Sequence, residues 1–595
     1  MTDRGTSPKE EVRRSEAAAY ICHVLRGYRA VWAIDFEYEV TLSLPVPVVL
    51  VATDLISGRT VKRGPGEFGQ CPFRCDGSEL FIAFYAVAEA SCFLALGWPL
   101  PPRWLDLWAE ARRLNNGRGG GNGLLDVMGR FRLPVRDSGQ KKAMQILVGE
   151  GNWHAADIPA ILAYCEEDVR DTELLAYAMM PLILSEAPDA SRALPQAIIR
   201  GTFVADCALV ERIGVPVDVN SFNLVRERWP EIRQLLIADV NTHYGVFQGD
   251  SFSAKLFGDY LAREQIPWPR LASGALQLDD DTFRQRAKSE PRIALLRECR
   301  VALSQLRGND IQVDADGRVR TPLRPLASKT GRCQPSTSKF LFGAARWTRS
   351  FIMAPPGHTF AYLDYKSQEI GIAAYLSGDQ LLVDAYSGGD PYIGFAKTAK
   401  LVPADATKES HPVMRAACKA IVLGVQYGMS AEGMAAASGV SLDTCRELLL
   451  RHHEPYHGLW RFVQSYRDRL AAGLPAYTPL GWRMQLGTGS DLNERSNGNW
   501  PIQSTGSDIL RAAVIFTTQA GVPPCATIHD ALAFVVPTEQ AEDLLSTAKE
   551  EMERAAIAVL GGSIGVDVTR YDHPNVYCDE SGFQFYERVM RMANA

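Results

Sequence analysis

Two stretches of β-prone residues, far apart in the chain, each end on an aspartate. In residues 361–369 the run Ala-Tyr-Leu leads into Asp364, and in residues 527–530 the run Thr-Ile-His leads into Asp530. A carboxylate at a strand end is held rigidly at a sheet edge, and two such groups can share a pair of divalent cations spaced roughly 3.5–4 Å apart. The pairing therefore predicts a two-metal nucleotidyl-transfer site.

Length and composition predict a multi-domain globular protein. With 595 residues the chain is too long for one hydrophobic core and should divide into about three or four domains. Its twelve cysteines show no repeated metal-site spacing, and no apolar run approaches the roughly 18 residues of a membrane span. We expect a cytoplasmic protein without a membrane partner. The net charge of −6 argues weakly against nucleic acid as a partner, but a multi-domain enzyme can keep a basic groove.

The residue patterns divide the chain into an α/β part and a longer mixed part. Residues 30–185 alternate strand-like and helical segments, with a surface loop at the glycine-rich residues 115–123. The polar stretch 185–195 is typical of a domain boundary. Residues 196–310 are helical and rich in arginine, which indicates either a solvated face or an arm that contacts a phosphate backbone. The two aspartates lie in sheet-like segments that flank a helical insertion at about 381–470.

A stripe of side chains is predicted within that insertion. Arg415, Lys419, Leu423 and Tyr427 follow at steps of four, and each step drifts by roughly 40° around a helix. Two cations followed by apolar and aromatic groups suit a triphosphate and the face of a base. The alternative is an amphipathic helix with two solvated basic residues, and this motif alone leaves both open.

Taken together, these motifs resemble the family A (DNA polymerase I type) DNA polymerases. The stripe, with Gly424 and Gly428, is similar to motif B, residues 364–369 and 376–379 to motif A, and His529-Asp530 to motif C. Further matches, in the family's order, lie at residues 214–218, 330–332, 478–483 and 495–503.

The resemblance implies a right-hand architecture, with a thumb at about 195–325, a palm at about 326–380 and 475–595, and fingers at about 381–474. It also implies that Asp364, Asp530 and the Tyr365 carbonyl hold two Mg²⁺ ions, for which Mn²⁺ is expected to substitute. Arg415 and Lys419 would grip the triphosphate, with Lys419 a candidate proton donor to the leaving group.

The resemblance assigns the remaining substrate contacts by position. Glu369 falls where the family excludes a ribose 2′-hydroxyl. Leu423 stands where Phe or Tyr is usual, so stacking on the incoming base should be weaker, and Ala531 replaces the glutamate that usually follows the motif C aspartate. The other expected substrate-binding residues are Gln368, Tyr427, Arg332, Arg495, Asn499, Gln503 and His529.

A second acidic constellation lies in the N-terminal part. Asp35 and Glu37 close a strand-like run, and Tyr164 and Asp168 share one face of a predicted helix. Such carboxylates and a phenol could bind two metals and orient a water, although surface acids are the alternative for either motif alone. Together they resemble the DEDDy type of 3′-to-5′ exonuclease, a ribonuclease H-like domain expected at residues 1–190.

The fourth acid of that site is the weakest assignment. The residues 84–89, Phe-Tyr-Ala-Val-Ala-Glu, stand where the family has a segment ending on aspartate, so we expect Glu89 as the fourth ligand and Asp106 as the fallback. An inactive exonuclease relic remains the alternative.

We expect a multi-domain α/β enzyme, a template-directed DNA polymerase with proofreading. Its partners would be primer-template DNA and dNTPs, with replisome accessory proteins left open, and it would act as a monomer. Because the chain begins at the exonuclease, without room for a 5′ nuclease domain, a phage or prophage origin is favoured. The competing hypotheses are a single-subunit RNA polymerase, opposed by Glu369 and the exonuclease motifs, and an inactive DNA-binding scaffold.

Overall fold

The N-terminal part of the protein is built on a mixed five-stranded sheet. The computed structural model describes residues 8–41, 44–305, 311–336, 339–343, 345–426, 428–438, 440–487 and 494–595. The strand order is β3-β2-β1-β4-β5, in which β1 runs antiparallel to β2 and parallel to β4. The strands are β1 (Ala30–Glu39), β2 (Val46–Asp54), β3 (Thr60–Arg63), β4 (Glu79–Ala83) and β5 (Trp104–Asp106).

Both faces of this sheet are covered, which explains why the start of β1 is an unbroken apolar run. Val31 and Ala33 belong to one buried cluster, whereas Trp32 and Ile34 belong to another, because successive side chains of a strand point to opposite faces. The helices of this part are α1 (Pro8–Val24), α2 (Val87–Ala95), α3 (Leu107–Asn115), α4 (Leu124–Arg130), α5 (Ser138–Gly149), the 3-10 helix η1 (Ala155–Asp157) and α6 (Ile158–Ser185).

A long helix, α7 (Ala190–Ile213), joins this part to the rest of the chain. It packs against α2 and β5 on one side and against α20 (Glu494–Gln519) on the other. By length and composition it is the one described helix that could cross a membrane, but 72% of its most apolar window is buried inside the protein. The polar stretch before it is short: α6 ends at Ser185 and α7 begins at Ala190.

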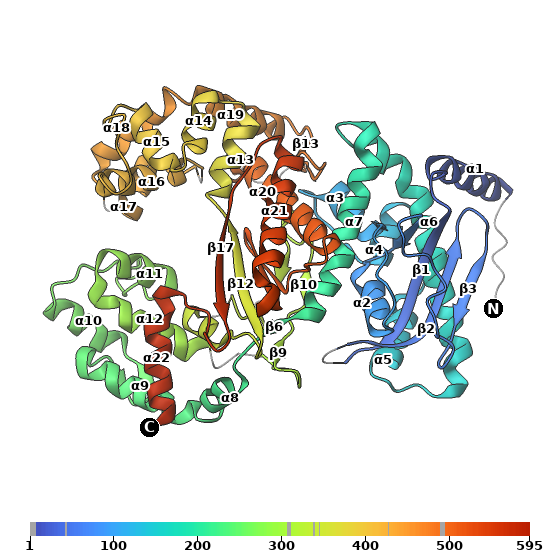
Figure 1. Ribbon diagram of the computed structural model, residues 1–595, viewed down its shortest axis with the longest axis horizontal. Coiled ribbons are helices and arrows are strands. Elements are labelled where there is room, and N and C mark those ends of the chain that lie inside the picture. Colours follow the sequence, from blue (N-terminus) through green and yellow to red (C-terminus); the bar gives the residue numbers. More distant parts are fainter. Residues whose placement is uncertain are drawn as a thin grey trace.

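The centre of the molecule is a four-stranded antiparallel sheet of order β15-β16-β12-β17. Helices α20 and α21 pack together beside it (Figure 1). Its elements are β12 (His358–Tyr365), α13 (Gln368–Ser377), β15 (Ala526–Ile528), β16 (Ala531–Pro537), η4 (Thr538–Gln540), α21 (Ala541–Leu560) and β17 (Val566–Asp572).

Two helical groups lie to the left of this sheet in Figure 1, the second group above the first. The C-terminal helix α22 (Glu580–Asn594) returns to the first group and packs on α8 and α9. The first group comprises α8 (Val219–Glu227), α9 (Trp229–Tyr244), α10 (Ala254–Arg263), α11 (Asp280–Ser289), η2 (Pro291–Ile293) and α12 (Ala294–Gln305). The second group comprises α14 (Gln380–Ser387), α15 (Pro391–Thr398), α16 (Pro412–Gln426), α17 (Ala431–Ser438), α18 (Leu442–His453) and α19 (His457–Ala471).

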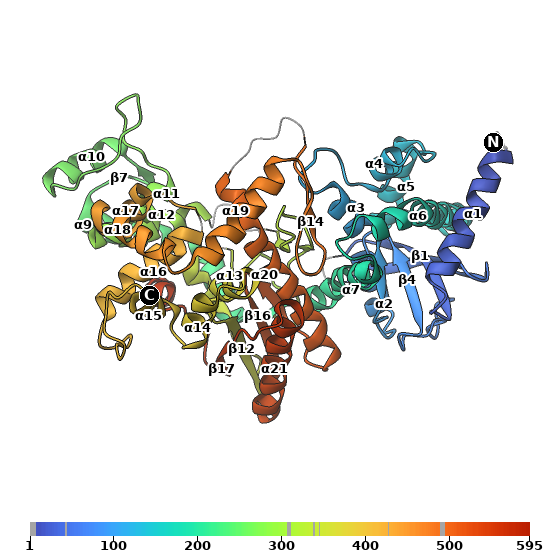
Figure 2. The ribbon, with the colours of Figure 1, turned by 90° about the horizontal axis from the view of Figure 1, so that it is seen from above.

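Short pieces complete the fold. They are β6 (Val215–Pro216), β7 (Phe247–Gln248), β8 (Ser251–Phe252), β9 (Arg318–Val319), β10 (Leu323–Arg324), β11 (Gln334–Pro335), η3 (Arg346–Phe351), β13 (Ala476–Tyr477) and β14 (Arg483–Met484). The view in Figure 2 places the N-terminal sheet beside the central one, with α7 between them. The mixed α/β class is confirmed, and so is the helical insertion between the two sheet segments that carry the aspartates.

Candidate active sites

The two aspartates of the central sheet meet at one end of it. Asp364 lies on β12 directly opposite Ala531 of β16. Asp530 precedes Ala531 in the tight turn between β15 and β16, a turn in which His529 adopts a positive φ of 52°. The backbone N–H of Tyr365 faces the Asp530 carbonyl at 3.5 Å. The antiparallel register therefore brings together carboxylates that are far apart in the sequence.

The electrostatics of this end of the sheet favour a bound cation. Burial, together with the neighbouring charges of Asp530 and Asp567, raises the pKa of Asp364 to about 7. The Oδ1 atom of Asp364 is buried without a hydrogen-bond partner among the described residues. Burial also raises the pKa of Asp530, although His529 and Arg332 oppose the shift. Crowded, desolvated carboxylates with an unpaired oxygen match the hard-oxygen donor set of Mg²⁺, so the residues fit this metal.

Asp567 is a third acid at this site, and it was not predicted from the sequence. It lies on β17 directly opposite Asp364, so both side chains point to the same face of the sheet. Its Oδ1 is 3.0 Å from the Lys366 ammonium. Asp567 sits in the unremarkable run Val566-Asp-Val, and only the strand register distinguishes it from a surface acid.

The predicted cationic stripe lies on α16, one helix of the second helical group. The Nε atom of Arg415 is 2.5 Å from Asp390, the residue that caps the start of α15. Arg415 and Lys419 both lie over the ring of Tyr392, at 5.3 and 5.6 Å from its centre. Tyr392 was not predicted; burial raises the pKa of its hydroxyl, and the charges of Arg415 and of Glu369 on α13 both act on it, so Tyr392 lies between the stripe and the end of the central sheet. Stripe and metal site therefore share one region.

The structure describes only the first of the last two positions of the stripe. Leu423 is partly buried and packs against the main hydrophobic core. Tyr427 lies outside the described residues.

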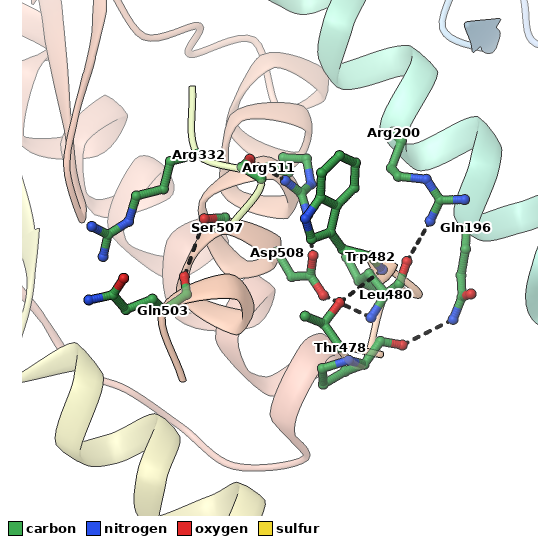
Figure 3. A network of polar contacts seen from close by, with 12 residues as sticks. Gln196, Arg200, Arg332, Thr478, Leu480, Trp482, Gln503, Ser507, Asp508 and Arg511 are labelled. Atoms are coloured by element: carbon green, nitrogen blue, oxygen red, sulfur yellow. Dashed lines mark hydrogen bonds and ion pairs between the residues drawn. The ribbon is translucent and has the colours of Figure 1, made fainter. Parts of the chain in front are cut away.

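Glu369 and Arg332 face each other beside the metal site. Glu369 stands in the first turn of α13, and its Oε1 is 3.5 Å from an Nη atom of Arg332. Gln368 is buried, and a Cβ added to Gly506 of α20 would lie 2.7 Å from its Oε1, so the two helices are in close contact here. Figure 3 shows Arg332 and Gln503 with their polar ends toward the same side.

Arg495 and Asn499, both on α20, line one pocket of 240 Å³ together with Gly428. The Oδ1 atom of Asn499 is buried and has no partner among the described residues. The two residues thus lie beside the end of the predicted stripe.

The N-terminal acidic residues also converge. Asp35 and Glu37 of β1 and Asp168 of α6 each place one carboxylate oxygen within 4.8 Å of the others. Burial raises the pKa of Asp35 to about 6, and burial together with the Asp35 charge raises that of Glu37 to about 9. These three carboxylates match the donor set of a divalent metal as well.

Of the two candidates for the fourth acid, only Glu89 has a carboxylate oxygen without a partner among the described residues, and neither belongs to the group of carboxylates that lie within 4.8 Å of one another. Glu89 is buried, its Oε2 lacks a hydrogen-bond partner among the described residues, and the charge of Asp35 helps to raise its pKa. Asp106 instead caps α3, accepting hydrogen bonds from the N–H groups of Ala86 at 2.5 Å and Ala109 at 2.6 Å. Both oxygens of Asp106 therefore have backbone partners.

Two cations that were not predicted from the sequence, Lys141 and Arg136, lie in this N-terminal cluster. The Nζ atom of Lys141 is 2.7 Å from both oxygens of Asp168, and Arg136 forms ion pairs with Asp168 and with Asp171. Both cations lie over the Tyr164 ring, at 5.5 Å for Arg136 and 5.4 Å for Lys141. The ammonium and guanidinium groups supply the positive charge that the carboxylates require.

A basic groove of 900 Å³ lies between the first helical group and the central sheet. His529 of the tight turn reaches into it. Its cationic lining residues are Arg284, Arg297, Arg300, Arg346 and Arg349.

Comparison with known proteins agrees with this geometry. The model of DNA polymerase family A matches residues 286–570. The DNA polymerase of Mycobacterium phage D29 is 25% identical, over 65% of this chain and 64% of that protein, and DNA polymerase I of Aquifex aeolicus is 26% identical, over 62% and 65%. Each match thus spans less than two thirds of the relative's length. The DNA polymerase of Mycobacterium phage L5 is 24% identical over 78% of both chains.

Among solved structures, the fold resembles the POL domain of Pol1 from M. smegmatis, in a complex with DNA primer-template and dNTP. The TM-score is 0.68 at 18% identity, and the alignment covers 93% of this chain and 97% of that one. At this identity the likeness establishes the fold.

Proposed function

We propose that the chain, whose residues 286–570 match the model of DNA polymerase family A, is a member of this family and extends a DNA primer with dNTPs on a template strand. One observation carries the proposal: Asp364 of β12 and Asp530 of the adjoining turn meet at one end of the central sheet, and the same site region includes Tyr392, over whose ring Arg415 and Lys419 lie. That arrangement combines a metal-binding acid pair with a triphosphate-binding cation pair.

The residues of this site divide the work of nucleotidyl transfer. Asp364, Asp530 and the Tyr365 carbonyl would hold two Mg²⁺ ions. When bound, these ions favour the ionised primer 3′-hydroxyl and neutralise charge on the leaving pyrophosphate. Arg415 exchanges its Asp390 partner for the triphosphate, and Lys419 delivers a proton to the pyrophosphate oxygen.

The groove between the first helical group and the central sheet is the proposed path of the primer-template. Its arginines provide the phosphate contacts that the net charge of −6 does not suggest. The tight turn that carries His529 borders the groove, so a primer lying there would bring its 3′ end to Asp530.

We propose further that the N-terminal cluster is a 3′-to-5′ exonuclease site that removes mismatched primer ends. Asp35, Glu37, Glu89 and Asp168 would hold the metals, and the Tyr164 hydroxyl would orient the attacking water. The buried, unpartnered Glu89 supports a working site over a relic, because an unpaired buried acid is costly unless a ligand uses it.

The remaining proposals concern the setting. Two of the relatives are mycobacteriophage DNA polymerases, so we propose that this enzyme copies a phage genome in the cytoplasm of a bacterial host. We also propose that it works as a monomer, which sedimentation with and without primer-template would test.

Primer extension with Mg²⁺ on a matched and a mismatched 3′ end tests both activities in one assay. Asp364→Asn should abolish extension and spare digestion, whereas Asp35→Ala should abolish digestion and spare extension. Extension at the wild-type rate by Asp364→Asn would refute the polymerase assignment. Unchanged digestion by Asp35→Ala would refute the exonuclease assignment.

A further inference from the structure

A buried polar network runs from the N-terminal part of the chain to the loop that carries Arg332 (Figure 3). It begins at Arg200 of α7, whose Nε is 2.5 Å from Glu110 of α3 and whose Nη1 donates to the Leu480 carbonyl at 2.6 Å. Gln196, one helical turn earlier, donates to the Pro479 carbonyl at 3.0 Å. The charged pair is almost fully buried, with 2% of Arg200 and none of Glu110 exposed. Helix α7 therefore holds the turn at residues 478–482 from the N-terminal side.

The network continues from that turn into α20. The Leu480 N–H donates to Asp508 Oδ2 at 2.9 Å, and the other oxygen of Asp508 pairs with Arg511. Both charged side chains are buried, so each depends on the other for compensation. The free end of the same guanidinium donates from Nη1 to the Gly331 carbonyl at 2.8 Å. Arg511 thus bridges the turn-binding carboxylate and the backbone beside Arg332.

The loop at residues 329–331 has no room to shift. Gly331 adopts a φ of +71°, and an added Cβ would lie 3.0 Å from the Trp482 ring and 3.2 Å from Arg511 Nη1. Just before it, the Lys329 carbonyl accepts hydrogen bonds from three side chains of different segments. The donors are Asn116 at 2.8 Å, Trp482 at 3.1 Å and Trp500 at 2.9 Å.

Arg332 directly follows Gly331, and its guanidinium lies 3.5 Å from Glu369 beside the metal site. We propose that Arg511, acting through Gly331, is a positioning residue for Arg332, and that Arg200 extends this control to the N-terminal part. The inference rests on the proposed polymerase activity, in which Arg332 contacts the substrate. The N-terminal part then supports the polymerase site mechanically as well as carrying its own acidic cluster.

The informative substitution is Arg511→Lys. A guanidinium can bind the Asp508 carboxylate with one edge and the Gly331 carbonyl with another, whereas one ammonium cannot span both. Arg511→Lys keeps the charge opposite Asp508 and removes the contact with the loop.

A double-mutant cycle with Arg332→Ala separates positioning from general stability. Extension would be measured in the Asp35→Ala background, so that digestion does not consume the primer, with rates normalised to titrated active sites. We expect Arg511→Lys to lower kcat/KM for dNTP by about tenfold in the Arg332 chain and by less than about twofold in the Arg332→Ala chain. If Arg511→Lys lowers kcat/KM by the same factor in the Arg332 chain and in the Arg332→Ala chain, the inference is overturned.

Trp482→Phe serves as a second variant should Arg511→Lys fail to fold. It removes the hydrogen bond to the Lys329 carbonyl and keeps an aromatic ring beside Gly331. It should also lower kcat/KM in the Arg332 chain and have no further effect in the Arg332→Ala chain. Equal factors again overturn the inference.

The role of Arg200 has a matched control in Arg113. Arg113 is equally buried and binds the same Glu110, at 2.7 Å, but its hydrogen-bond partners, Glu110 and the carbonyls of Ile183 and Glu186, all lie in the N-terminal part. Arg200→Lys should lower kcat/KM for dNTP by roughly three- to tenfold, and Arg113→Lys should leave it unchanged. Equal effects of the two variants overturn the link to the N-terminal part. A wild-type chain that extends no primer would overturn the proposed function and this inference with it.

Discussion

At the scale of single residues, Glu369 is expected to select the sugar of the incoming nucleotide. Its carboxylate is held by Arg332 at 3.5 Å, and 18% of its side chain is exposed. Glu369→Ala should raise the ratio of kcat/KM for ribonucleotides over deoxynucleotides by at least about tenfold, because the side chain that fills the 2′ position is lost. Glu369→Gln keeps the volume and should retain most of the selection. An unchanged ratio for the alanine variant, measured on one primed template, would contradict this role.

Lys141 is expected to compete with metal at the N-terminal cluster. It neutralises Asp168, so a divalent ion that binds there must displace the ammonium. Lys141→Met should therefore lower the Mg²⁺ concentration needed for half-maximal digestion by roughly tenfold. Terbium luminescence, which reports binding without turnover, should show the same change. A variant that needs more Mg²⁺ would instead mean that Lys141 assists the substrate.

The same cluster should respond to pH with a definite sign. The pKa of Asp35 is raised to about 6 and that of Glu37 to about 9, so protons compete with metal below these values. Metal binding should therefore tighten as the pH rises from about 6 to about 9. Metal titrations at both ends of this range check the expectation, and equal affinities would contradict it.

The site residues that could be predicted from the sequence are those that stand in a recognisable local pattern, such as the end of an apolar strand or a helical spacing. Asp364 and Asp35 end apolar strand runs, and Asp168 follows Tyr164 at a helical spacing. Asp567 and Lys141 carry no such signal, because strand register brings the first to its site and the packing of α5 brings the second. Contacts of this kind depend on tertiary structure, which spacing along the chain does not encode.

At the scale of elements, helix α7 contains a buried carboxyl group whose ionisation opposes folding. Asp206 is 6% exposed, and burial alone raises its pKa to about 8. The folded state retains a proton that the unfolded chain releases above its ordinary pKa of 3.8, so stability falls as the pH rises from about 4 to about 8. Asp206→Asn should remove this loss and increase the free energy of unfolding near pH 8 by roughly 1–3 kcal/mol. Chemical denaturation at about pH 5 and pH 8 should show a larger gain at the higher pH, and equal gains would contradict the expectation.

Long periodic elements were predictable, whereas short ones were not. The strand near residue 31, the helix from Ile158 and the helix with Arg415 at steps of four all carry a clear period. The two-residue strands β6 to β11 carry none, since their pairing is decided by neighbours elsewhere in the chain. The network at residues 478–482 belongs to the same class: its partners come from α7 and α20, and the sequence of that stretch indicates only its resemblance to the family.

At the scale of the whole molecule, the uneven placement of charge matters more than its sum. An acidic chain of net charge −6 carries a groove with five arginines, so its affinity for DNA should depend on salt as if the protein were basic. Arg284→Ala, in this groove, should weaken primer-template binding and reduce the slope of log K against log salt by roughly 1. Arg554 is the control: it pairs with Glu551 on α21, is similarly exposed at 59% against 54% for Arg284, and does not line the groove. Arg554→Ala should leave the slope unchanged. Equal slopes for wild type and Arg284→Ala, measured by fluorescence anisotropy across a salt series, would place the DNA elsewhere on the molecule.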